Sequence, residues 1–467
     1  MKAKDIQKAG VPAGPLLKLT MKLLGPATQA GLKKKQISER LRSIVAAPDA
    51  HIDDPLFGEL AKAMVGTAEE DQAERARERA EPAPWQMWGS DLDRAAIGQM
   101  RNACRIPVAV QGALMPDAHP GYGLPIGGVL ATDNAVIPFA VGVDIACRMK
   151  LSIVDLPIVG IERDREHLGR VLEQKTCFGS GGAFKSPKDH SVMHEDWDFS
   201  PVTKRIKGKA QSQLGTSGSG NHFVEYGVIT LDEPDLGLDA GQYVAILSHS
   251  GSRGPGAAVA DHFWKQAMEL HKGLPKQLRH LGWLDLDTDL GKEYWLAMQL
   301  MGRFAAANHE IIHRELVRTL KTKVLSAIEN HHNFAWKEPH GGREVIVHRK
   351  GATPAASKDL GIVPGSMASP GFLVRGRGVP ESLNSASHGA GRLMSRSEAK
   401  NSFAWSNVKK DLDAAGITVL SAGIDECPGA YKDIHTVMRQ QKDLVEVIAR
   451  FDPKIVKMAP SGDRPED

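Results

Sequence analysis

The chain has 467 residues, of which 42% are hydrophobic and 25% are charged, as in an ordinary soluble globular protein. Its net charge of +3 is too small to indicate nucleic-acid binding by itself, and its four widely spaced cysteines do not form a disulfide framework. No apolar run reaches transmembrane length, and the N-terminus lacks the apolar core of a signal peptide. We therefore expect a cytoplasmic protein with a large core and no membrane partner.

The first 84 residues differ in charge from the rest of the chain. Positions 1–50 contain ten lysines and arginines against three acidic residues, whereas positions 51–84 contain nine acidic residues against four basic ones. Apolar residues at helical spacing predict a helix over 36–47, and the run 69–81 is typical of a charged helix or linker. The basic end could contact RNA, but a helical arm that is solvated or packed against another molecule is the simpler interpretation. We predict a helical, charged extension over 1–84.

The segment from Val141 to Lys150 places two metal-binding residue types three positions apart. Asp144 and Cys147 lie in a largely apolar stretch. Residues three apart in a strand point to opposite faces, so these two converge on one ion only if the backbone bends between them. A carboxylate and a thiolate together suit a divalent metal. For this pair alone, a buried cysteine beside a capping aspartate is the alternative.

Two polar segments flank that stretch. The glycine-rich segment 115–123 follows a predicted strand over 108–114, and Asp117 and His119 alternate in it. They form either an ordinary turn or a pair that orients metal ligands. Residues 175–213 are rich in Gly, Ser and Lys and predict a mobile, solvated loop whose lysines could contact phosphates.

The next motif combines small residues with a histidine. Small side chains over 214–225 let backbone N–H groups approach an anion closely. The last five positions supply an amide, an imidazole and a carboxylate, from Asn221, His222 and Glu225. A strand predicted over 244–247 ends near His249, which opens a second Gly/Ser loop. A histidine at a strand end is a typical ligand position, although a single histidine is more often structural.

The longest predicted helix, 294–319, suggests a different chemistry. It contains the sequence His309-Glu310-Ile311-Ile312-His313, whose spacing puts two histidines on one helix face as in zinc proteases. Glu329 follows as a candidate third ligand. A zinc metalloprotease is therefore an alternative function, although it leaves the other histidine and glycine clusters unexplained.

The C-terminal third contains a histidine that small neighbours expose. His388 precedes Gly389-Ala390-Gly391-Arg392, so an accessible imidazole has a cation nearby, as attack on a phosphorus centre requires. A last cluster spans 425–433, and 433–452 predicts a helix before a frayed tail over 453–467. Neither Gly-Lys pair is followed by Ser or Thr, so no Walker A loop occurs, and no Lys-x-Asp-Gly motif of lysine-nucleotidyl ligases is found.

Nine segments together resemble the RtcB-type RNA-splicing ligase family. In chain order they read M-P-D-A-H-P-G-Y-G, V-G-V-D-I-A-C, G-S-G-N-H-F-V-E, S-H-S-G-S-R-G, H-H-N-F-A, R-K-G-A-T-P-A, P-G-S-M, S-H-G-A-G-R and D-E-C-P-G-A-Y-K-D. Each motif is weak alone, but nine in family order from Gln86 to Asp433 form a strong signal. Members of this family use GTP and manganese to join an RNA end carrying a 2′,3′-cyclic phosphate or 3′-phosphate to a 5′-hydroxyl end.

The resemblance implies roles for individual residues. Two Mn²⁺ ions would be held by Asp144, Cys147, His222, His249 and His332, with Cys147 bridging them. His388 would be the residue that becomes guanylylated by GTP. The positions lining the guanine nucleotide would be Asn221, His222, Phe223, Val224, Glu225, His332, Asn333, Pro364, Gly365, Ser366, Met367, Gly389, Ala390, Gly391 and Lys432. Manganese rests on the resemblance alone, because cysteine and histidine ligands by themselves would indicate zinc.

The same resemblance implies a fold and a reaction. The expected fold is α+β, with a single large catalytic domain over 85–452 whose mixed and antiparallel sheets surround a central metal cleft. A cyclic phosphate would be opened to a 3′-phosphate, which would take the guanylyl group from His388 before the 5′-hydroxyl displaces GMP. The reaction would serve tRNA splicing or RNA repair, and the family leaves room for an activating protein partner. An RNA-end-binding relative that does not ligate is a further alternative.

Overall fold

The computed structural model describes residues 1–75 and 77–463, with only the backbone described over 67–75. Contacts divide the chain into two compact units, Met1–Arg77 and Glu78–Asp467. The predicted boundary after residue 84 lies later than this division. The reason is that Arg79 and Ala83 donate their backbone N–H groups to the carbonyls of Arg105 and Cys104, which ties residues 78–84 to the second unit.

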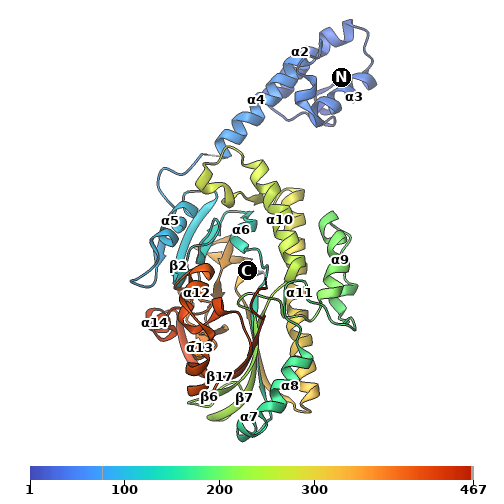
Figure 1. Cartoon of the computed structure of the whole chain (residues 1–467). Helices are drawn as coiled ribbons and strands as arrows, with labels where there is room; N and C mark the ends of the chain where they lie inside the picture. The colour runs from blue at the N-terminus through green and yellow to red at the C-terminus, as the bar shows by residue number, and fades with distance from the viewer. Residues whose placement is uncertain (76, 464–467) are drawn as a thin grey trace. The chain divides into compact units, whose positions relative to one another are not determined.

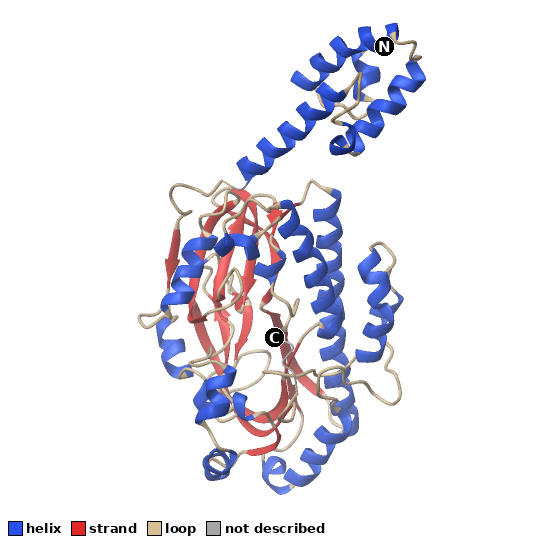
Figure 2. Cartoon of the chain, turned by 45° about the horizontal axis from the view of Figure 1, so that its top comes forward, coloured by secondary structure: helices blue, strands red, loops and turns tan. Residues whose placement is uncertain are grey.

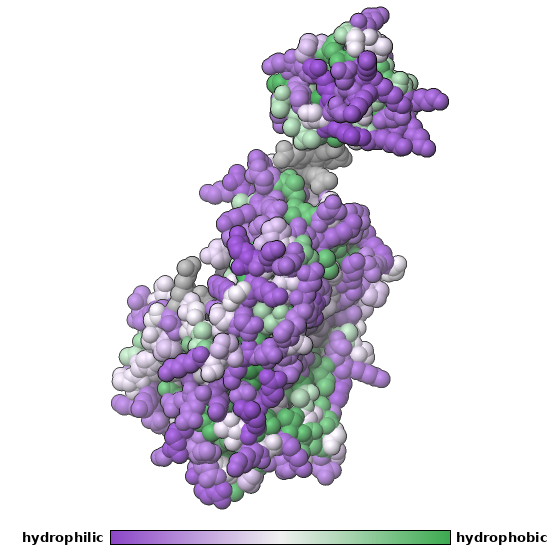
Figure 3. Space-filling view, turned by 90° about the vertical axis from the view of Figure 1, so that its right-hand side faces the viewer, coloured by the Kyte–Doolittle hydropathy of each residue, from purple (hydrophilic) through white to green (hydrophobic). Residues whose placement is uncertain are grey.

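The N-terminal unit is helical, as predicted. Its helices are α1 Ala3–Gln7, α2 Pro15–Gln29, α3 Lys34–Ala46, η1 Pro48–His51 and α4 Gly58–Arg75. The predicted helix is confirmed as α3, which buries Ile37, Leu41 and Ile44 at helical spacing. These side chains pack with Phe57 and Leu60 in a core that belongs to this unit. Hydrophilic residues predominate on the face of the unit seen in Figure 3.

The second unit is built on strands. They are β1 Trp85–Met87, β2 Ala109–His119, β3 Ile126–Thr132, β4 Ala135–Val136, β5 Arg148–Val154, β6 Phe223–Leu231, β7 Gly241–Ser250, β8 Leu284–Asp285, β9 Val324–His331, β10 Asn333–His340, β11 Arg343–Lys350, β12 Ala352–Pro354, β13 Leu360–Val363, β14 Gly371–Gly376, β15 Ser385–Ser387, β16 Thr418–Ser421 and β17 Val445–Met458.

The helices of the second unit lie between these strands in the sequence. They are α5 Arg94–Ala103, α6 Pro138–Val141, α7 Val159–Arg163, α8 Arg165–Lys175, η2 Ser191–His194, α9 Pro201–Gln213, α10 Arg253–Leu270, η3 Lys276–Leu281, α11 Asp289–Thr319, η4 Pro380–Ser382, α12 Arg396–Ser402, α13 Trp405–Ala414, η5 Ile424–Glu426, η6 Pro428–Ala430 and α14 Ile434–Gln440.

Two large sheets form the framework of the second unit, and two two-stranded sheets, β12-β15 and β4-β8, accompany them. The larger has the order β13-β14-β17-β6-β7-β5-β9 with β16 beside β17, and the smaller has the order β1-β2-β3-β11-β10. Neighbouring strands in these sheets are antiparallel except for two parallel pairs, β1 with β2 and β16 with β17. These pairings confirm the predicted α+β fold with mixed and antiparallel sheets.

The larger sheet curves until its edge strands approach each other. Ile362 of β13 donates its backbone N–H to Asn330 Oδ1 of β9 at 3.0 Å. Side chains alternate between two cores along each strand, so that in β7 Ile246 faces one core and Leu247 the other. Helices α8 and α11 cover the first of these cores, beside the strands in Figures 1 and 2.

Helix α11 is the long helix predicted from the sequence. It begins after Thr288, whose hydroxyl accepts a hydrogen bond from the Gly291 N–H and so caps the first turn. Phe304 and Ile311 are among the apolar residues that it buries in the core. In the parts of the chain that the structure describes, none of the helices, α11 included, combines the length and apolarity that a bilayer crossing requires.

The prediction for the C-terminal residues is wrong. Residues 433–452 are helical only over α14, and the predicted tail at 453–467 begins inside β17. This strand lies between β14 and β6 in the middle of the larger sheet, so residue 452 is not a boundary. The reason is packing, because Ala449, Phe451 and Ile455 are buried although charged residues interrupt the segment.

The prediction of a mobile loop over 175–213 is also wrong in part. The segment contains η2 and the thirteen-residue helix α9. Helix α9 buries Val202, Ile206 and Ala210 at helical spacing in the core that α10 and α11 share. The lysines between these positions obscure the apolar period in the sequence.

Candidate functional site

The segment from Asp144 to Cys147 is a turn. Ala146 has a φ of +57°, in the left-handed region that costs a residue with a side chain about 1–2 kcal/mol. The Cys147 N–H donates to the Asp144 carbonyl at 3.2 Å, and β5 begins only at Arg148. The backbone bend that convergence of Asp144 and Cys147 requires is therefore present.

Five side chains meet at this turn. Cys147 Sγ lies 3.3 Å from His222 Nε2 and 3.1 Å from His249 Nε2. His249 Nε2 is 3.2 Å from His332 Nε2, and Asp144 Oδ2 is 3.1 Å from His222 Nε2. They form two groups that share the thiol, Cys147 with His249 and His332, and Cys147 with Asp144 and His222. Each group has the composition of a site for one divalent ion.

Strand pairing explains why residues so distant in sequence meet. Neighbouring strands are antiparallel, so β5 and β6 begin where β7 and β9 end. All four termini therefore lie at the same end of the larger sheet. Arg148 pairs with both Ser250 and His331, and Phe223 pairs with His249. The ligand candidates sit at or next to these terminal positions.

The charge states of the cluster fit a divalent metal. Burial lowers the pKa of His249 and of His332 well below the ordinary value, so both rings are neutral and keep a lone pair. Burial opposes ionisation of Asp144, but the contacts with His222 and Arg253 outweigh it and lower the pKa of this carboxyl. Asp144 Oδ2 is buried and faces another member of the cluster, His222 Nε2, at 3.1 Å. A cation bound between these groups would satisfy that oxygen.

Two glycines make room for this arrangement. A Cβ on Gly251 would lie 2.1 Å from Asp144 Oδ2, and a Cβ on Gly218 would lie 1.8 Å from Arg253 Nη1. Arg253 in turn donates to His222 Nδ1 at 2.7 Å and to the carbonyl of Ser217 at 2.9 Å. The small residues before His222 were expected to let the backbone approach an anion. Ser217 and Gly218 instead contact a cation, the Arg253 guanidinium that orients His222.

His388 lies beside the cluster with one ring nitrogen held by a carboxylate. Its Nδ1 is 2.7 Å from Asp117 Oδ2, and its backbone N–H donates to the same oxygen at 3.2 Å. The ring centroids of His388 and His332 are 4.8 Å apart. Since a carboxylate only accepts, Nδ1 carries a proton, and in the neutral ring Nε2 keeps the lone pair. Asp117 thus belongs to an orienting pair, but it orients His388 and not a metal-ligand candidate.

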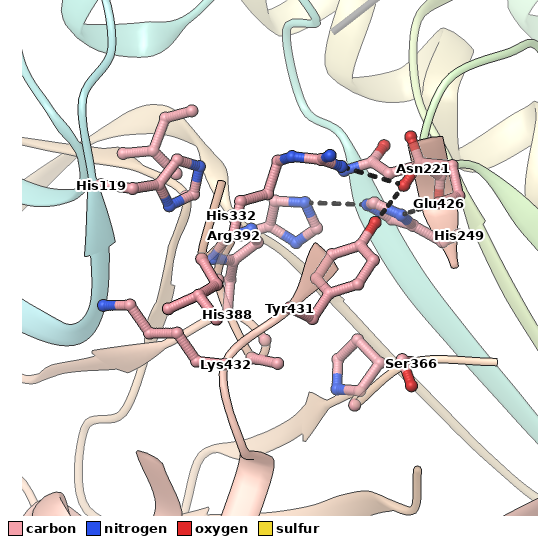
Figure 4. A pocket seen from close by; sticks show the side chains of 18 of the residues that line it. His119, Asn221, His249, His332, Ser366, His388, Arg392, Glu426, Tyr431 and Lys432 are labelled. Atoms are coloured by element: carbon pink, nitrogen blue, oxygen red, sulfur yellow. Dashed lines mark hydrogen bonds and ion pairs between the residues drawn. The ribbon is translucent and has the colours of Figure 1, made fainter. Parts of the chain in front are cut away.

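One cavity of about 720 Å³ joins His388 to the cluster. In Figure 4, His388 and His332 lie between Asn221 on one side and His119 with Lys432 on the other. The nucleotide residues predicted from the sequence that line the cavity are Asn221, Phe223, Glu225, His332, Asn333, Pro364, Gly365, Ser366, Met367, Gly389, Ala390, Gly391 and Lys432. Asp144, Cys147 and His249 line it as well, so the metal and nucleotide candidates share one space.

Two of the predicted nucleotide residues do not line this cavity. The side chain of His222 is fully buried within the cluster. Val224 lies in the core on the other face of β6, because Phe223 and Glu225 on either side of it face the cavity. The Val224 side chain therefore faces away from the cavity, and a role of this residue in nucleotide binding stays a prediction.

Two cations in the wall of the cavity are held by protein groups. Lys432 Nζ donates to the carbonyls of Pro116 and Ala118, on either side of Asp117, at 3.0 and 2.9 Å. Arg392 donates to the carbonyl of Asp425 at 2.8 Å and to Glu426 Oε2 at 3.3 Å. Lys432 therefore supports the segment that orients His388.

The H-E-x-x-H residues have a structural role. All four ring nitrogens of His309 and His313 bind protein groups: Ser248 Oγ contacts both rings, His309 Nε2 donates to the Ser250 carbonyl, and Ser152 Oγ lies 2.8 Å from His313 Nδ1. Glu310 is exposed and pairs with His190. The two histidines hold the end of β7 around His249, and this geometry offers no site for a catalytic zinc ion.

Several cavity residues were not expected from the sequence. Val456 and Met458 line the cavity from β17, and Tyr122 and Lys350 line it from the loop after β2 and the end of β11. Burial lowers the pKa of Lys350 to about 7. The alternation of apolar and polar residues up to Met458 could have indicated a strand that contains Val456 and Met458. Tyr122 and Lys350 lie inside two of the family motifs, but their residue types alone indicate no particular role.

Comparison with known proteins gives one consistent family. A family model described as tRNA-splicing ligase RtcB matches residues 99–458. The chain is 35% identical over 401 residues to RNA-splicing ligase RtcB of Escherichia coli (strain K12), covering 79% of this chain and 95% of that protein. It is 32% identical over 439 residues to tRNA-splicing ligase RtcB of Nanoarchaeum equitans, covering 78% and 91%. It is also 30% identical over 440 residues to RNA-splicing ligase RtcB homolog 1 of Entamoeba dispar, covering 78% and 81%.

Proposed function

This chain belongs to the RtcB family of RNA-splicing ligases, and on that premise we propose that it is an RNA ligase. Its substrates are an RNA end carrying a 2′,3′-cyclic phosphate or 3′-phosphate and an RNA end carrying a 5′-hydroxyl. GTP supplies the energy, two Mn²⁺ ions are the metals, and the product serves tRNA splicing or RNA repair.

The observation that carries the proposal is the position of His388. Its proton is held on Nδ1 by Asp117, and its Nε2 has a lone pair beside a group of metal-ligand candidates. An uncharged imidazole nitrogen is a good nucleophile toward phosphorus and also a good leaving group. Asp117 stabilises the positive charge that develops on the ring when Nε2 forms a bond.

The cluster would hold the two ions. Cys147 would bridge them, with Asp144 and His222 on one ion and His249 and His332 on the other. Dications there would neutralise charge on phosphate oxygens during each displacement. Thiolate and imidazole ligands also suit zinc, so the preference for manganese follows from the family and not from the ligand types.

The buried carboxyl of Glu225 fits a guanine base. It lines the cavity while only 6% exposed, and burial raises its pKa well above the ordinary value. A guanine edge presents two adjacent N–H donors, which favour the ionised carboxylate and repay its desolvation. An adenine edge presents no such pair of donors, so the residue would select GTP over ATP.

The reaction follows in balanced steps. Water opens the cyclic phosphate to a 3′-phosphate. His388 Nε2 then attacks the α-phosphorus of GTP, a phosphoramidate bond forms and pyrophosphate leaves. An oxygen of the RNA 3′-phosphate takes the guanylyl group and frees His388. Finally, the 5′-hydroxyl attacks the activated phosphate, loses its proton and expels GMP.

Labelling with GTP tests the proposal. The protein is incubated with Mn²⁺ and GTP labelled at the α-phosphorus, and then with an RNA bearing a cyclic phosphate and one bearing a 5′-hydroxyl. We expect acid-labile label on the wild type, none on His388→Ala, and joining by the wild type alone. Label without joining would reduce the protein to an RNA-end-binding relative, and joining by His388→Ala would refute the proposal.

A further inference from the structure

One wall of the cavity includes an exposed aromatic side chain. In Figure 4, His119 lies on the far side of His388 from Asn221 and Ser366. The same loop continues to Tyr122, which also lines the cavity and is 67% exposed. Among the Phe, Trp and Tyr residues in the described part of the chain, Tyr122 alone is largely exposed.

The backbone that carries Tyr122 is fixed from several sides. Lys350 Nζ donates to the Tyr122 carbonyl at 2.6 Å. Gln99 of α5 binds both backbone groups of Gly121, accepting from its N–H and donating to its carbonyl. Gly123 has a φ of +72°, and a Cβ on this residue would lie 3.0 Å from the carbonyl oxygen of His280. The loop backbone therefore passes close to that carbonyl. The loop is therefore held in place before any ligand binds.

The Tyr122 ring is supported by other rings without being covered by them. Its centroid lies 6.2 Å from that of Phe139, at an interplanar angle of 89°, and 5.9 Å from that of His280, at 57°. Such tilted and edge contacts orient an aromatic ring. With two-thirds of the residue exposed, the ring offers apolar surface to the cavity, which is unfavourable in water unless a ligand covers it.

We propose that Tyr122 forms a stacking subsite for the nucleobase at one of the two RNA ends. This inference rests on the proposed RNA ligase function. A reacting RNA end must lie next to His388 and the metal candidates, and Tyr122 lines the same cavity as these residues. His119, three positions before Tyr122, lies on the side of His388 away from Asn221 and Ser366, two of the residues expected to line the guanine nucleotide. Every base has a π-face, so a stacking platform accepts any end sequence, as repair or splicing of different RNAs requires.

A double-mutant cycle between Tyr122 and the terminal base tests the stack. Binding of short RNA strands with a terminal 3′-phosphate or a terminal 5′-hydroxyl is measured by fluorescence anisotropy, each strand with its terminal base present or replaced by an abasic site. For one of the two strands, Tyr122→Ala should weaken binding by about 5- to 150-fold, the range of one base–aromatic stack. Tyr122→Phe and Tyr122→Trp should bind as the wild type does.

The abasic strands decide whether the effect comes from stacking. If Tyr122 stacks on the terminal base, Tyr122→Ala should cause no further loss with the abasic strand, and the strand that shows this coupling identifies the end. Equal losses with normal and abasic strands, or no loss with either strand, would overturn the proposal.

Guanylylation separates this proposal from the ligase proposal. Tyr122→Ala should acquire label from GTP at the wild-type rate, while the RNA concentration for half-maximal joining rises and the maximal rate does not change. Loss of labelling in Tyr122→Ala would overturn the stacking role, because it would place Tyr122 in the nucleotide step. If the wild type is neither labelled by GTP nor able to join RNA ends, the ligase proposal fails. The double-mutant cycle would still show whether Tyr122 stacks on the terminal base.

Discussion

Replacing Asp117 by asparagine should slow guanylylation of His388 without removing any metal-ligand candidate. Asp117 Oδ2 accepts two hydrogen bonds from His388, one from Nδ1 at 2.7 Å and one from the backbone N–H at 3.2 Å. An asparagine carbonyl can accept both, but it lacks the negative charge. If the amide NH₂ faces the ring instead, the proton moves to Nε2 and the nucleophilic lone pair is lost.

The magnitude follows from the charge. A hydrogen bond to a charged group contributes about 1.5–3 kcal/mol, against about 1 kcal/mol for a neutral pair. The imidazole becomes positive as Nε2 attacks phosphorus, so the ionic contribution is felt mainly in the transition state. Replacing the charged acceptor by a neutral one therefore loses about 0.5–2 kcal/mol, which corresponds to a rate lower by between just over twofold and about 30-fold.

The assay is the initial rate of label transfer from GTP to the protein at saturating GTP and Mn²⁺. The matched control is Asp359→Asn, which neutralises an exposed carboxylate between β12 and β13 and should react at the wild-type rate. Manganese affinity should be the same in both variants, which separates orientation of His388 from damage to the metal site. A rate for Asp117→Asn within about twofold of wild type would refute the reasoning.

Three other perturbations test different parts of the site. Gly251→Ala should weaken Mn²⁺ binding by about 10- to 100-fold, measured by titration, because the added Cβ would lie 2.1 Å from Asp144 Oδ2. His309→Ala should lower the free energy of unfolding in urea by about 2–5 kcal/mol, because the buried Ser248 hydroxyl and Ser250 carbonyl lose a hydrogen-bond partner. The folded His309→Ala variant should still be labelled by GTP, whereas His388→Ala should not. Burial raises the pKa of Glu225, so ionisation on guanine binding releases a proton; the affinity for GTP should rise with pH by up to about tenfold per unit until the pH passes that pKa.

Controls and contrary results for these tests are available in the same chain. Gly208→Ala adds a Cβ that meets nothing within 4 Å and should leave Mn²⁺ affinity unchanged. Normal Mn²⁺ affinity in Gly251→Ala would contradict the close approach of its backbone to the carboxylate. Loss of labelling in folded His309→Ala, with labelling kept in His388→Ala, would revive the metalloprotease. For Glu225, the matched variant is Glu225→Gln, in which the pH dependence should shrink to that of the nucleotide phosphates, and an unchanged slope would exclude the carboxyl as its source.

Residue types and the order of the motifs were enough to predict which groups meet at the site. Asp144, Cys147 and the histidines could be named because their residue types bind metals, and their motifs stand in the order of a known family. The need for a bend between Asp144 and Cys147 was also predictable, because strand geometry forbids convergence otherwise. The left-handed φ of Ala146 supplies that bend.

The contacts of the neighbouring groups could not be predicted and became visible in the folded chain. The sequence could not show that Asp117 binds His388, since 271 positions separate them and β2 has to bring one to the other. Nor could it show that His309 serves as a structural partner of Ser248, or that β17 lies in the middle of the larger sheet. Local patterns report which groups are present, whereas pairing of distant strands and burial decide which of them meet and in what charge state.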